Sequence, residues 1–153
     1  MRTAKQVSVS LVNKPGRLAA MLDALNKEKV SLQALVVMDS GDRGTIRFVP
    51  DDLAKATQVL ADMNAKHDVG EVLLIEVPSQ SGAFRKICQR LAAEHLNIDY
   101  AYCSFSGGGS SKKGPLAVIR VNDLAKAQRV LSENGVTARR RQAQPTRRPV
   151  YAH

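Results

Sequence analysis

The chain contains the stretch Asp52-Leu-Ala-Lys-Ala-Thr-Gln-Val-Leu60 and, 71 residues later, the nearly identical stretch Asp123-Leu-Ala-Lys-Ala-Gln-Arg-Val-Leu131. Nearer the start of each half the offset is 66, as for Gly16 and Gly82. The second copy therefore has five extra residues. We place them in the Gly- and Ser-rich segment 106–114, whose composition is typical of a flexible loop. This self-similarity predicts a tandem of one structural unit.

Hydrophobic periodicity predicts the elements of the first copy. Apolar residues alternate over 7–11, which predicts a half-buried strand, and they recur at helical spacing over 17–29, which predicts an amphipathic helix. Segments 32–38 and 45–49 predict the two strands of a hairpin. Asp51 or Asp52 then caps a second helix, followed by a short last strand near Val69. The inner face of that helix would carry Leu53, Ala56, Val59, Leu60 and Met63.

The second copy repeats this order. We expect strands over 72–77, 99–105, 116–121 and 136–142, and helices over 82–95 and 123–134. The first of these helices would turn Phe84, Ile87, Cys88 and Leu91 inward. Two helices on one face of a four-stranded antiparallel sheet make a ferredoxin-like βαββαβ unit. The predicted fold class is therefore α+β, with two such units side by side.

These patterns also suggest the domain boundaries. Unit one would span 1–70 and unit two 71–142, followed by a basic tail over 143–153 that we expect to be disordered. The net charge of +9 is concentrated near the end of the chain, where five arginines lie within the last fifteen residues. Such a tail is either a solvated terminus or an anchor for nucleic acid or an acidic partner.

Composition excludes several classes of protein. Cys88 and Cys103 are the only cysteines, too few for a disulfide framework, and we expect both to be core residues. His67, His95 and His153 have no partners at metal-ligand spacing, so we expect no metal and no cofactor. No apolar run reaches the roughly 18 residues that span a membrane, which favours a cytoplasmic protein with no membrane attachment.

The segment Asn13-Lys-Pro-Gly16 leads into the first helix and is a candidate binding loop. Gly16 allows a strained turn and a close approach of the backbone, and Pro15 fixes the direction of the chain. The next backbone N–H groups, through about Leu18, have no partner within the helix, and the helix dipole favours an anion there. A plain strand-to-helix turn explains the same residues.

The order and spacing of these motifs resemble the ACT domain, a family of amino-acid-sensing regulatory modules. The resemblance rests on Asn13-Lys-Pro-Gly16-Arg-Leu18 and on Leu96-Asn97-Ile98-Asp99-Tyr100, and it covers the chain to about Gln142. In such domains a ligand lies between the Pro-Gly loop of one unit and the start of the second strand of the other. The resemblance thus implies a ligand site made of Asn13, Lys14, Pro15, Gly16, Arg17, Leu18, Asn97, Ile98 and Tyr100.

A reciprocal site would be weaker, because its loop has changed. Ser79 stands where the first copy has Asn13, and Ser81 where it has Pro15. The residues of this second site would be Ser79, Ser81, Gly82, Ala83 and Ser31. Serine-sensing members of the family carry a histidine where Leu11 stands, which disfavours serine and suggests a ligand with an apolar side chain.

The resemblance also implies the partners. We expect an amino acid ligand, a homodimer formed through exposed sheet edges, a partner enzyme that the chain regulates, and no catalytic residues. The alternatives are an interaction module without a ligand and an RNA-binding module with the basic tail. Against RNA, Thr45 and Arg47 stand where an RNA recognition motif has stacking aromatics, so nucleic acid is disfavoured.

Overall fold

The structure is a computed structural model, and it describes residues 1–78, 81–104 and 115–137. The predictions for the loop 106–114, for most of the last strand and for the basic tail concern residues outside these ranges. In chain order the elements are β1 (Arg2–Val12), α1 (Arg17–Lys27), β2 (Leu32–Ser40), β3 (Arg43–Pro50), α2 (Leu53–Asp62), β4 (Lys66–Glu76), α3 (Ala83–Ala93), β5 (Ile98–Cys103), β6 (Leu116–Val121) and α4 (Leu124–Thr137).

All six described strands form one antiparallel sheet, in the order β2-β3-β1-β4-β6-β5. Its centre is the ladder between the two long strands, which runs from the Arg2–Leu74 pair to the Ser10–Lys66 pair. Each long strand serves both units: β1 also pairs with β3, and β4 also pairs with β6. The short strands predicted near Val69 and over 72–77 are thus one continuous strand, and the expected domain boundary at 70/71 falls inside it.

The prediction of a last strand over 136–142 is wrong at its start, because Val136 and Thr137 belong to α4. Asp123 caps this helix by accepting a hydrogen bond from the Lys126 N–H at 3.0 Å. The place beside β4 that a fourth strand of unit two would take is occupied by the first residues of β1. The N-terminus therefore supplies the fourth strand position of the second unit.

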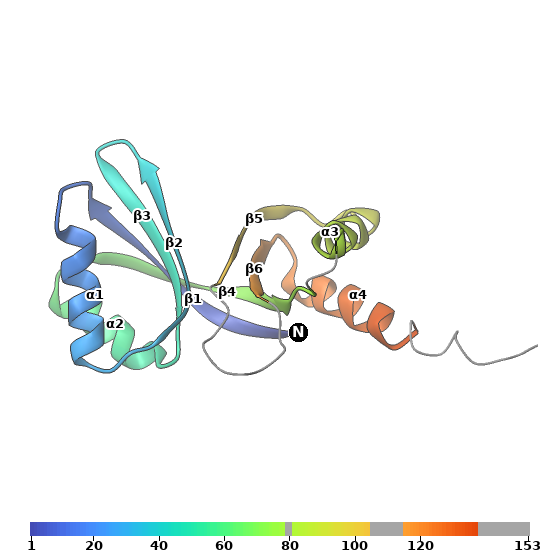
Figure 1. Ribbon diagram of the computed structural model, residues 1–153, viewed down its shortest axis with the longest axis horizontal. Helices are drawn as coiled ribbons and strands as arrows, with labels where there is room; N and C mark the ends of the chain where they lie inside the picture. The colour runs from blue at the N-terminus through green and yellow to red at the C-terminus, as the bar shows by residue number, and fades with distance from the viewer. Residues whose placement is uncertain (79–80, 105–114, 138–153) are drawn as a thin grey trace, which may run out of the picture.

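The helices lie on one face of the sheet, as expected for ferredoxin-like units. Val7 and Val9 of β1 face α1 and α2 in one core, while Leu73 and Ile75 of β4 face α3 and α4 in a second core. Thr3 lies on the same face of β1 as Val7 and Val9, because alternate residues of a strand share a face, and Thr3 pairs with Leu73 of β4. The two cores therefore lie on the same face of the sheet. The sheet is so strongly coiled that the two helix pairs lie at opposite ends of the molecule (Figure 1).

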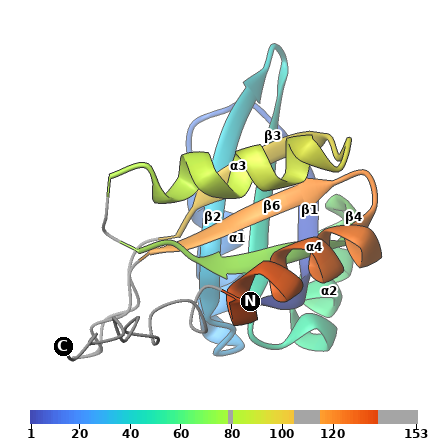
Figure 2. The same ribbon diagram turned by 90° about the vertical axis from the view of Figure 1, so that its right-hand side faces the viewer.

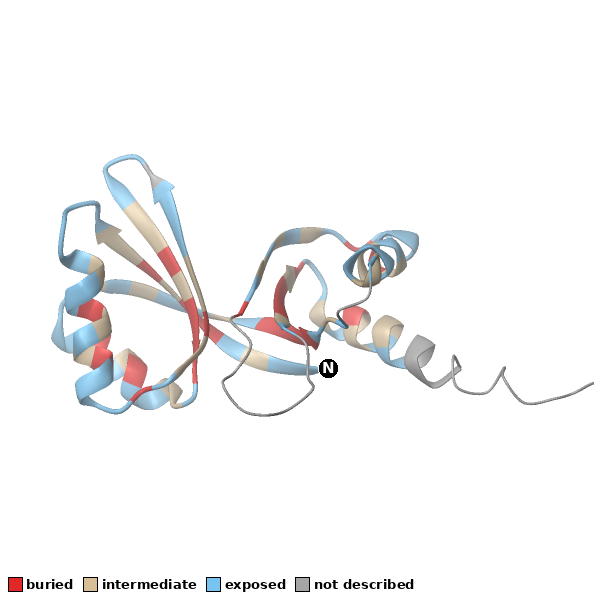
Figure 3. Ribbon diagram, viewed as in Figure 1, coloured by how far each residue is buried: buried red, intermediate tan, exposed pale blue. Residues whose placement is uncertain are grey.

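The helix-free face of the sheet closes partly on itself. Ala34 and Val49 of unit one pack there with Val72, Leu74 and Val118, forming a third core (Figure 3). The outer strands β2 and β5 consequently approach one another. Beyond this contact the β2–β3 hairpin projects from the body (Figure 2).

The internal repeat is reproduced in the hydrogen bonds. The Ser31 N–H donates to the Asp51 carboxylate and the Asp51 N–H to the Ser31 carbonyl oxygen, both at 2.9 Å. In the second copy, Asn97 and Asn122 exchange the same two bonds. Asp52 caps α2 as predicted, accepting from the Lys55 N–H. The offsets of 66 and 71 thus describe equivalent positions in space as well as in sequence.

Three expected core residues are not buried. Met63 and Phe84 are each 37% exposed, and Cys103 is exposed, whereas Cys88 is half-buried. Met63 follows the last turn of α2 and Phe84 lies in the first turn of α3, where the helices begin to leave the sheet. Cys103 lies on the outer strand β5, and its partner Ala117 on β6 is fully buried. The helix layer therefore covers β6 rather than β5.

Candidate ligand sites

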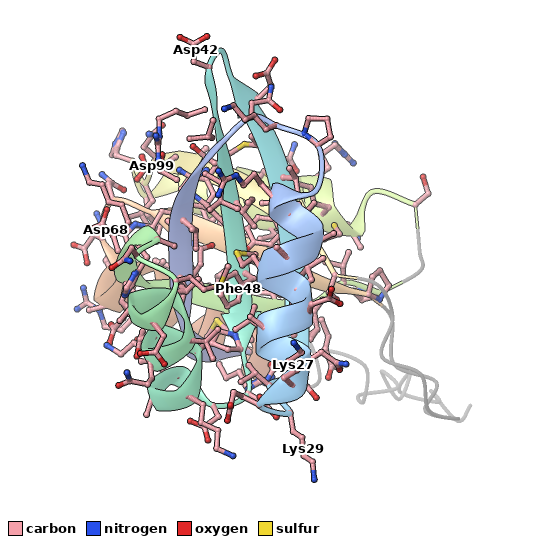
Figure 4. All side chains as sticks on the ribbon, turned by 90° about the vertical axis from the view of Figure 1, so that its left-hand side faces the viewer. Lys27, Lys29, Asp42, Phe48, Asp68 and Asp99 are labelled. Atoms are coloured by element: carbon pink, nitrogen blue, oxygen red, sulfur yellow. The ribbon has the colours of Figure 1, made fainter. Side chains whose placement is uncertain are left out.

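The Asn13–Gly16 loop is held against the tip of the β2–β3 hairpin. The Asn13 N–H donates to the Asp42 carbonyl oxygen at 2.9 Å, and its side-chain amide reaches the Gly41 carbonyl oxygen at 3.5 Å. Figure 4 shows Asp42 at the tip of this hairpin. Asn13 is thus committed in part to holding two loops together, and Asn13, Lys14, Pro15, Gly16 and Arg17 are all exposed.

Gly16 makes the start of α1 accessible. Its φ of 87° lies in the left-handed region, and a Cβ at this position would meet no atom within 4 Å. Gly16 is the N-cap residue but offers no side chain to cap the helix. Within the described ranges the N–H groups of Leu18 and Ala19 have no acceptor. With the helix dipole, these two donors favour an anionic group at this point.

A pocket of about 70 Å³ lies beside these donors. Its apolar wall consists of Leu11, Leu18, Val37 and Ile46, and its polar rim consists of Asn13, Lys14 and Arg17. The side chains of Lys14 and Arg17 make no hydrogen bond or ion pair with any described residue. Since one water occupies about 30 Å³ in the liquid, the pocket is too small to enclose an amino acid.

Val37 and Ile46 are wall residues that the sequence motif did not reveal. They pair with each other across β2 and β3, and their side chains reach the α1 loop only because the hairpin lies beside it. Val37 is 51% exposed although it is apolar. The alternation of apolar residues in these strands was a signal in the sequence, but it did not indicate which loop Val37 and Ile46 face.

The structure does not bring Asn97, Ile98 and Tyr100 to this pocket. The Asn97 side-chain amide donates to the Asp99 carboxylate at 3.0 Å, and its backbone N–H donates to Asn122. Tyr100 lines a different pocket, which it shares with Gln6 and Arg47. Within one chain, the two halves of the site that the sequence suggested therefore lie apart.

The second loop differs from the first in its surroundings. Gly82 has a φ of 80° and also caps its helix without a side chain, but the Arg85 guanidinium lies 3.7 Å from the position of a Cβ. Ser81 is exposed and Ala83 half-buried, while Ser79 lies outside the described ranges. Ser31 is bound to Asp51 on the far side of unit one. The helix start here is partly covered by a cation.

Tyr100 and Tyr102 belong to a polar cluster on the helix-free face. The Tyr102 hydroxyl donates to Gln6 Oε1 at 2.8 Å, and Gln6 Nε2 donates to the Tyr100 hydroxyl oxygen. Burial is the largest cause that raises the pKa of the Tyr102 hydroxyl well above its ordinary value, so this hydroxyl stays protonated and acts as the donor. The Arg47 guanidinium stacks on the Tyr100 ring at 4.2 Å from its centroid.

Within the described ranges no group of three or more His, Cys, Asp or Glu side chains is placed to hold a metal ion. In the same part of the chain, no helix is long and apolar enough to cross a membrane.

The structure contains two ferredoxin-like units, and the first helix of each unit begins at a glycine with a positive φ. Together they define a pair of small regulatory domains. The chain belongs to the ACT domain pair family, which matches residues 2–140. ACT domains are regulatory modules and typically have no catalytic activity. A search of curated protein sequences found no match.

Solved structures agree with this assignment. Protein BT0572 from Bacteroides thetaiotaomicron is 33% identical, covering 87% of this chain and 89% of that chain, with a TM-score of 0.79. The ligand-free regulatory subunit of aspartate kinase from Thermus thermophilus is 15% identical over 86% and 91% of the two chains, with a TM-score of 0.60. The corresponding subunit from Thermus flavus is 17% identical over 87% and 96%, with a TM-score of 0.54. The last two likenesses show the fold alone.

Proposed function

We propose that this protein binds an amino acid with an apolar side chain at the start of α1, and that it regulates a partner without catalysing a reaction itself. The observation that carries the proposal is the pocket beside Gly16, which combines free N–H donors, two unpaired cations and an apolar wall. The ligand is an expectation from chemistry, since the carboxylate and the apolar side chain of such an amino acid each have a counterpart there.

The ligand's carboxylate would lie against the N–H groups of Leu18 and Ala19, where the helix dipole and the Arg17 side chain both favour negative charge. Its apolar side chain would face Leu11 and Val37. Leu11 is half-buried in this wall, so at this position the wall presents an apolar side chain to the ligand and no polar group. This arrangement supports an aliphatic or aromatic amino acid over serine.

A second copy of the chain is the surface that would complete the site. Burial falls along β2 from Ala34, which is 4% exposed, to Val37 and Met38, which are 51% and 37% exposed. The outer half of β2 is an edge whose backbone groups have no neighbouring strand on one side, and such edges pair readily with another chain. Pairing two β2 edges would cover Val37 and place a second surface over the pocket.

A partner enzyme is the third part of the proposal. Two of the structural neighbours are regulatory subunits of aspartate kinase, and these names describe a subunit distinct from a catalytic one. The alignments span 91% and 96% of those subunits, so the likeness covers nearly the whole of each regulatory chain. A separate enzyme chain is the partner that this likeness suggests.

A thermal-shift screen against the twenty amino acids tests the ligand class. We expect apolar amino acids to raise the melting temperature most, because a ligand present at about 100 times its Kd adds ~2.7 kcal/mol of stability. Leu11→Asn should weaken that response, since it places an amide in the apolar wall. Ile87→Asn, at a half-buried apolar position in the second core, is the matched control. No shift with any amino acid would contradict the proposal.

A further inference from the structure

The helix-free face of the sheet carries a polar groove that the proposed amino acid site does not use. Two adjoining pockets, of about 630 and 280 Å³, share Ser8, Arg47 and Asp68. These three residues pair in a row across β3, β1 and β4, and Ser10 pairs with Thr45 and Lys66 in the next row. We call this surface the helix-free groove. Its side chains come from Gln6, Ser8, Ser10, Arg43, Thr45, Arg47, Lys66, Asp68, Tyr100 and Arg120.

The helix-free groove is positively charged. Four cationic side chains line it, namely Arg43, Arg47, Lys66 and Arg120, against the single carboxylate of Asp68. Arg43 donates to Ser10, and Arg120 donates to the Glu71 carbonyl oxygen, while the Glu71 carboxylate forms its ion pair with Lys5. The side chains of Lys66 and Asp68 make no hydrogen bond or ion pair with any described residue. Figure 4 shows Asp68 on the side of the molecule away from α1.

Arg47 is incompletely satisfied at the centre of the groove. Its Nε is buried and has no hydrogen-bond partner within the described residues. Its Nη1 reaches only the Met38 sulfur at 3.8 Å, a weak acceptor. Leaving a buried donor unpaired destabilises the folded state, and an ion or water that is bound in solution is a usual explanation. The guanidinium is oriented by its stacking on Tyr100, and Arg47 lines both pockets, so a terminal nitrogen of the guanidinium is the donor that an anion in the groove would meet.

Tyr100 adds a second donor that faces the groove. Its hydroxyl oxygen accepts from Gln6 Nε2, and Gln6 in turn accepts from Tyr102. The direction of these bonds is set, because Tyr102 can only donate to the Gln6 oxygen. The hydrogen of the Tyr100 hydroxyl therefore remains without an acceptor among the described residues. The Ser8 hydroxyl lies in the same row as Arg47 and is also without a partner there.

We propose that the helix-free groove binds a small organic anion through a phosphate or carboxylate group. The Arg47 guanidinium edge holds the anion, and the hydroxyls of Tyr100 and Ser8 donate to it. Arg43, Lys66 and Arg120 supply the surrounding positive charge. The two pockets together have the size of a small-molecule site, roughly 300–1,000 Å³. This site is separate from the α1 pocket, so the protein would respond to two chemically different ligands.

The test is a thermal-shift titration of the full chain in Tris with inorganic phosphate, with succinate, and with sodium chloride at equal ionic strength. At about 20 mM phosphate or succinate we expect a rise of about 3 °C over chloride for the parent. Arg47→Met should abolish this rise while unfolding within about 2 °C of the parent without anion, because it keeps the packing and removes the unpaired donor. Lys66→Gln, at an exposed position, should reduce the rise without affecting the fold.

Arg17→Gln, at the rim of the α1 pocket, is the matched control and should keep the full anion response. Arg47→Met should in turn keep any response to amino acids, so failure of one site is distinguishable from failure of the other. A rise with phosphate alone or with succinate alone identifies which group the site takes. An equal rise in chloride, or a parental response in Arg47→Met, would overturn the proposal. Arg47-dependent binding of a single-stranded RNA without any response to the small anions would overturn it too.

Discussion

Substituting Phe48 with alanine should lower the free energy of unfolding by about 3–5 kcal/mol, the range found for large-to-small changes of buried aromatic residues. Phe48 lies on β3 and is 0% exposed in the first core. Figure 4 shows Phe48 between α1 and α2. With only 4% aromatic residues in the chain, few other side chains have the volume to fill the cavity. Urea denaturation followed by circular dichroism measures the loss.

Phe84→Ala is the matched control, because it removes the same side chain from a site that is 37% exposed. We expect a loss of about 1 kcal/mol or less there. Since β1 and β4 run through both units, Phe48→Ala should shift a single transition instead of creating a second one. Equal losses for the two variants, or two separated transitions in Phe48→Ala, would contradict the burial and the shared strands.

Substituting Val37 with lysine should weaken amino acid binding by about 10- to 100-fold and convert the proposed dimer into a monomer. The lysine removes an apolar wall residue, whose burial contributes about 1.5–3 kcal/mol, and each 1.4 kcal/mol is a tenfold change in affinity. It also places a charge on the β2 edge, which is a known means of preventing strands from pairing. Calorimetry gives the affinity, and light scattering gives the mass.

The control for Val37→Lys is Met63→Lys, which adds the same charge at an apolar residue that is 37% exposed and remote from β2. That variant should keep both the parental affinity and the parental mass. If Val37→Lys stays dimeric and binds like the parent, β2 is not the edge that completes the site.

Local patterns were sufficient to predict the helices and the hairpins. The strand Leu116–Val121 was predicted at the residue, and the cap of α2 was narrowed to Asp51 or Asp52, because apolar alternation and capping chemistry depend on near neighbours only. Helix ends were predicted two residues too late in α1 and α3. There Lys29 and His95, at equivalent positions, take a positive φ of 56° that ends each helix.

The shared strands could not be predicted in the same way. Repeat units suggest two closed four-stranded sheets, but pairing between β1 and β4 depends on contacts between residues that are 56 to 72 positions apart. Gly70, at the expected boundary, lies within β4, where it pairs with Gln6 and leaves room for the Arg120 side chain, 3.0 Å from where a Cβ would lie. The helix-free groove was not predicted either. Ser8 and Arg47 alternate with core residues, and such alternation predicts polar side chains that face solvent.

The ligand loop stays a prediction from its motif; four of its residues, Asn13, Lys14, Arg17 and Leu18, line one pocket. The start of β5 was assigned to that pocket only through the family's arrangement. Asn97 instead repeats the bond pattern of Ser31, which ties the start of each second strand to the segment before each second helix. The position of a site that two units share therefore depends on which of their surfaces contact each other, and this is a property of the assembly.

Amide hydrogen exchange, measured with and without the amino acid that gives the largest thermal shift, tests the binding site most directly. Our account predicts that the ligand slows exchange of the Leu18 and Ala19 N–H groups, which are now without acceptors, and of the exposed edge of β2 around Val37. Unchanged exchange at Leu18 and Ala19, with protection confined to residues 81–83 and 97–100, would contradict it.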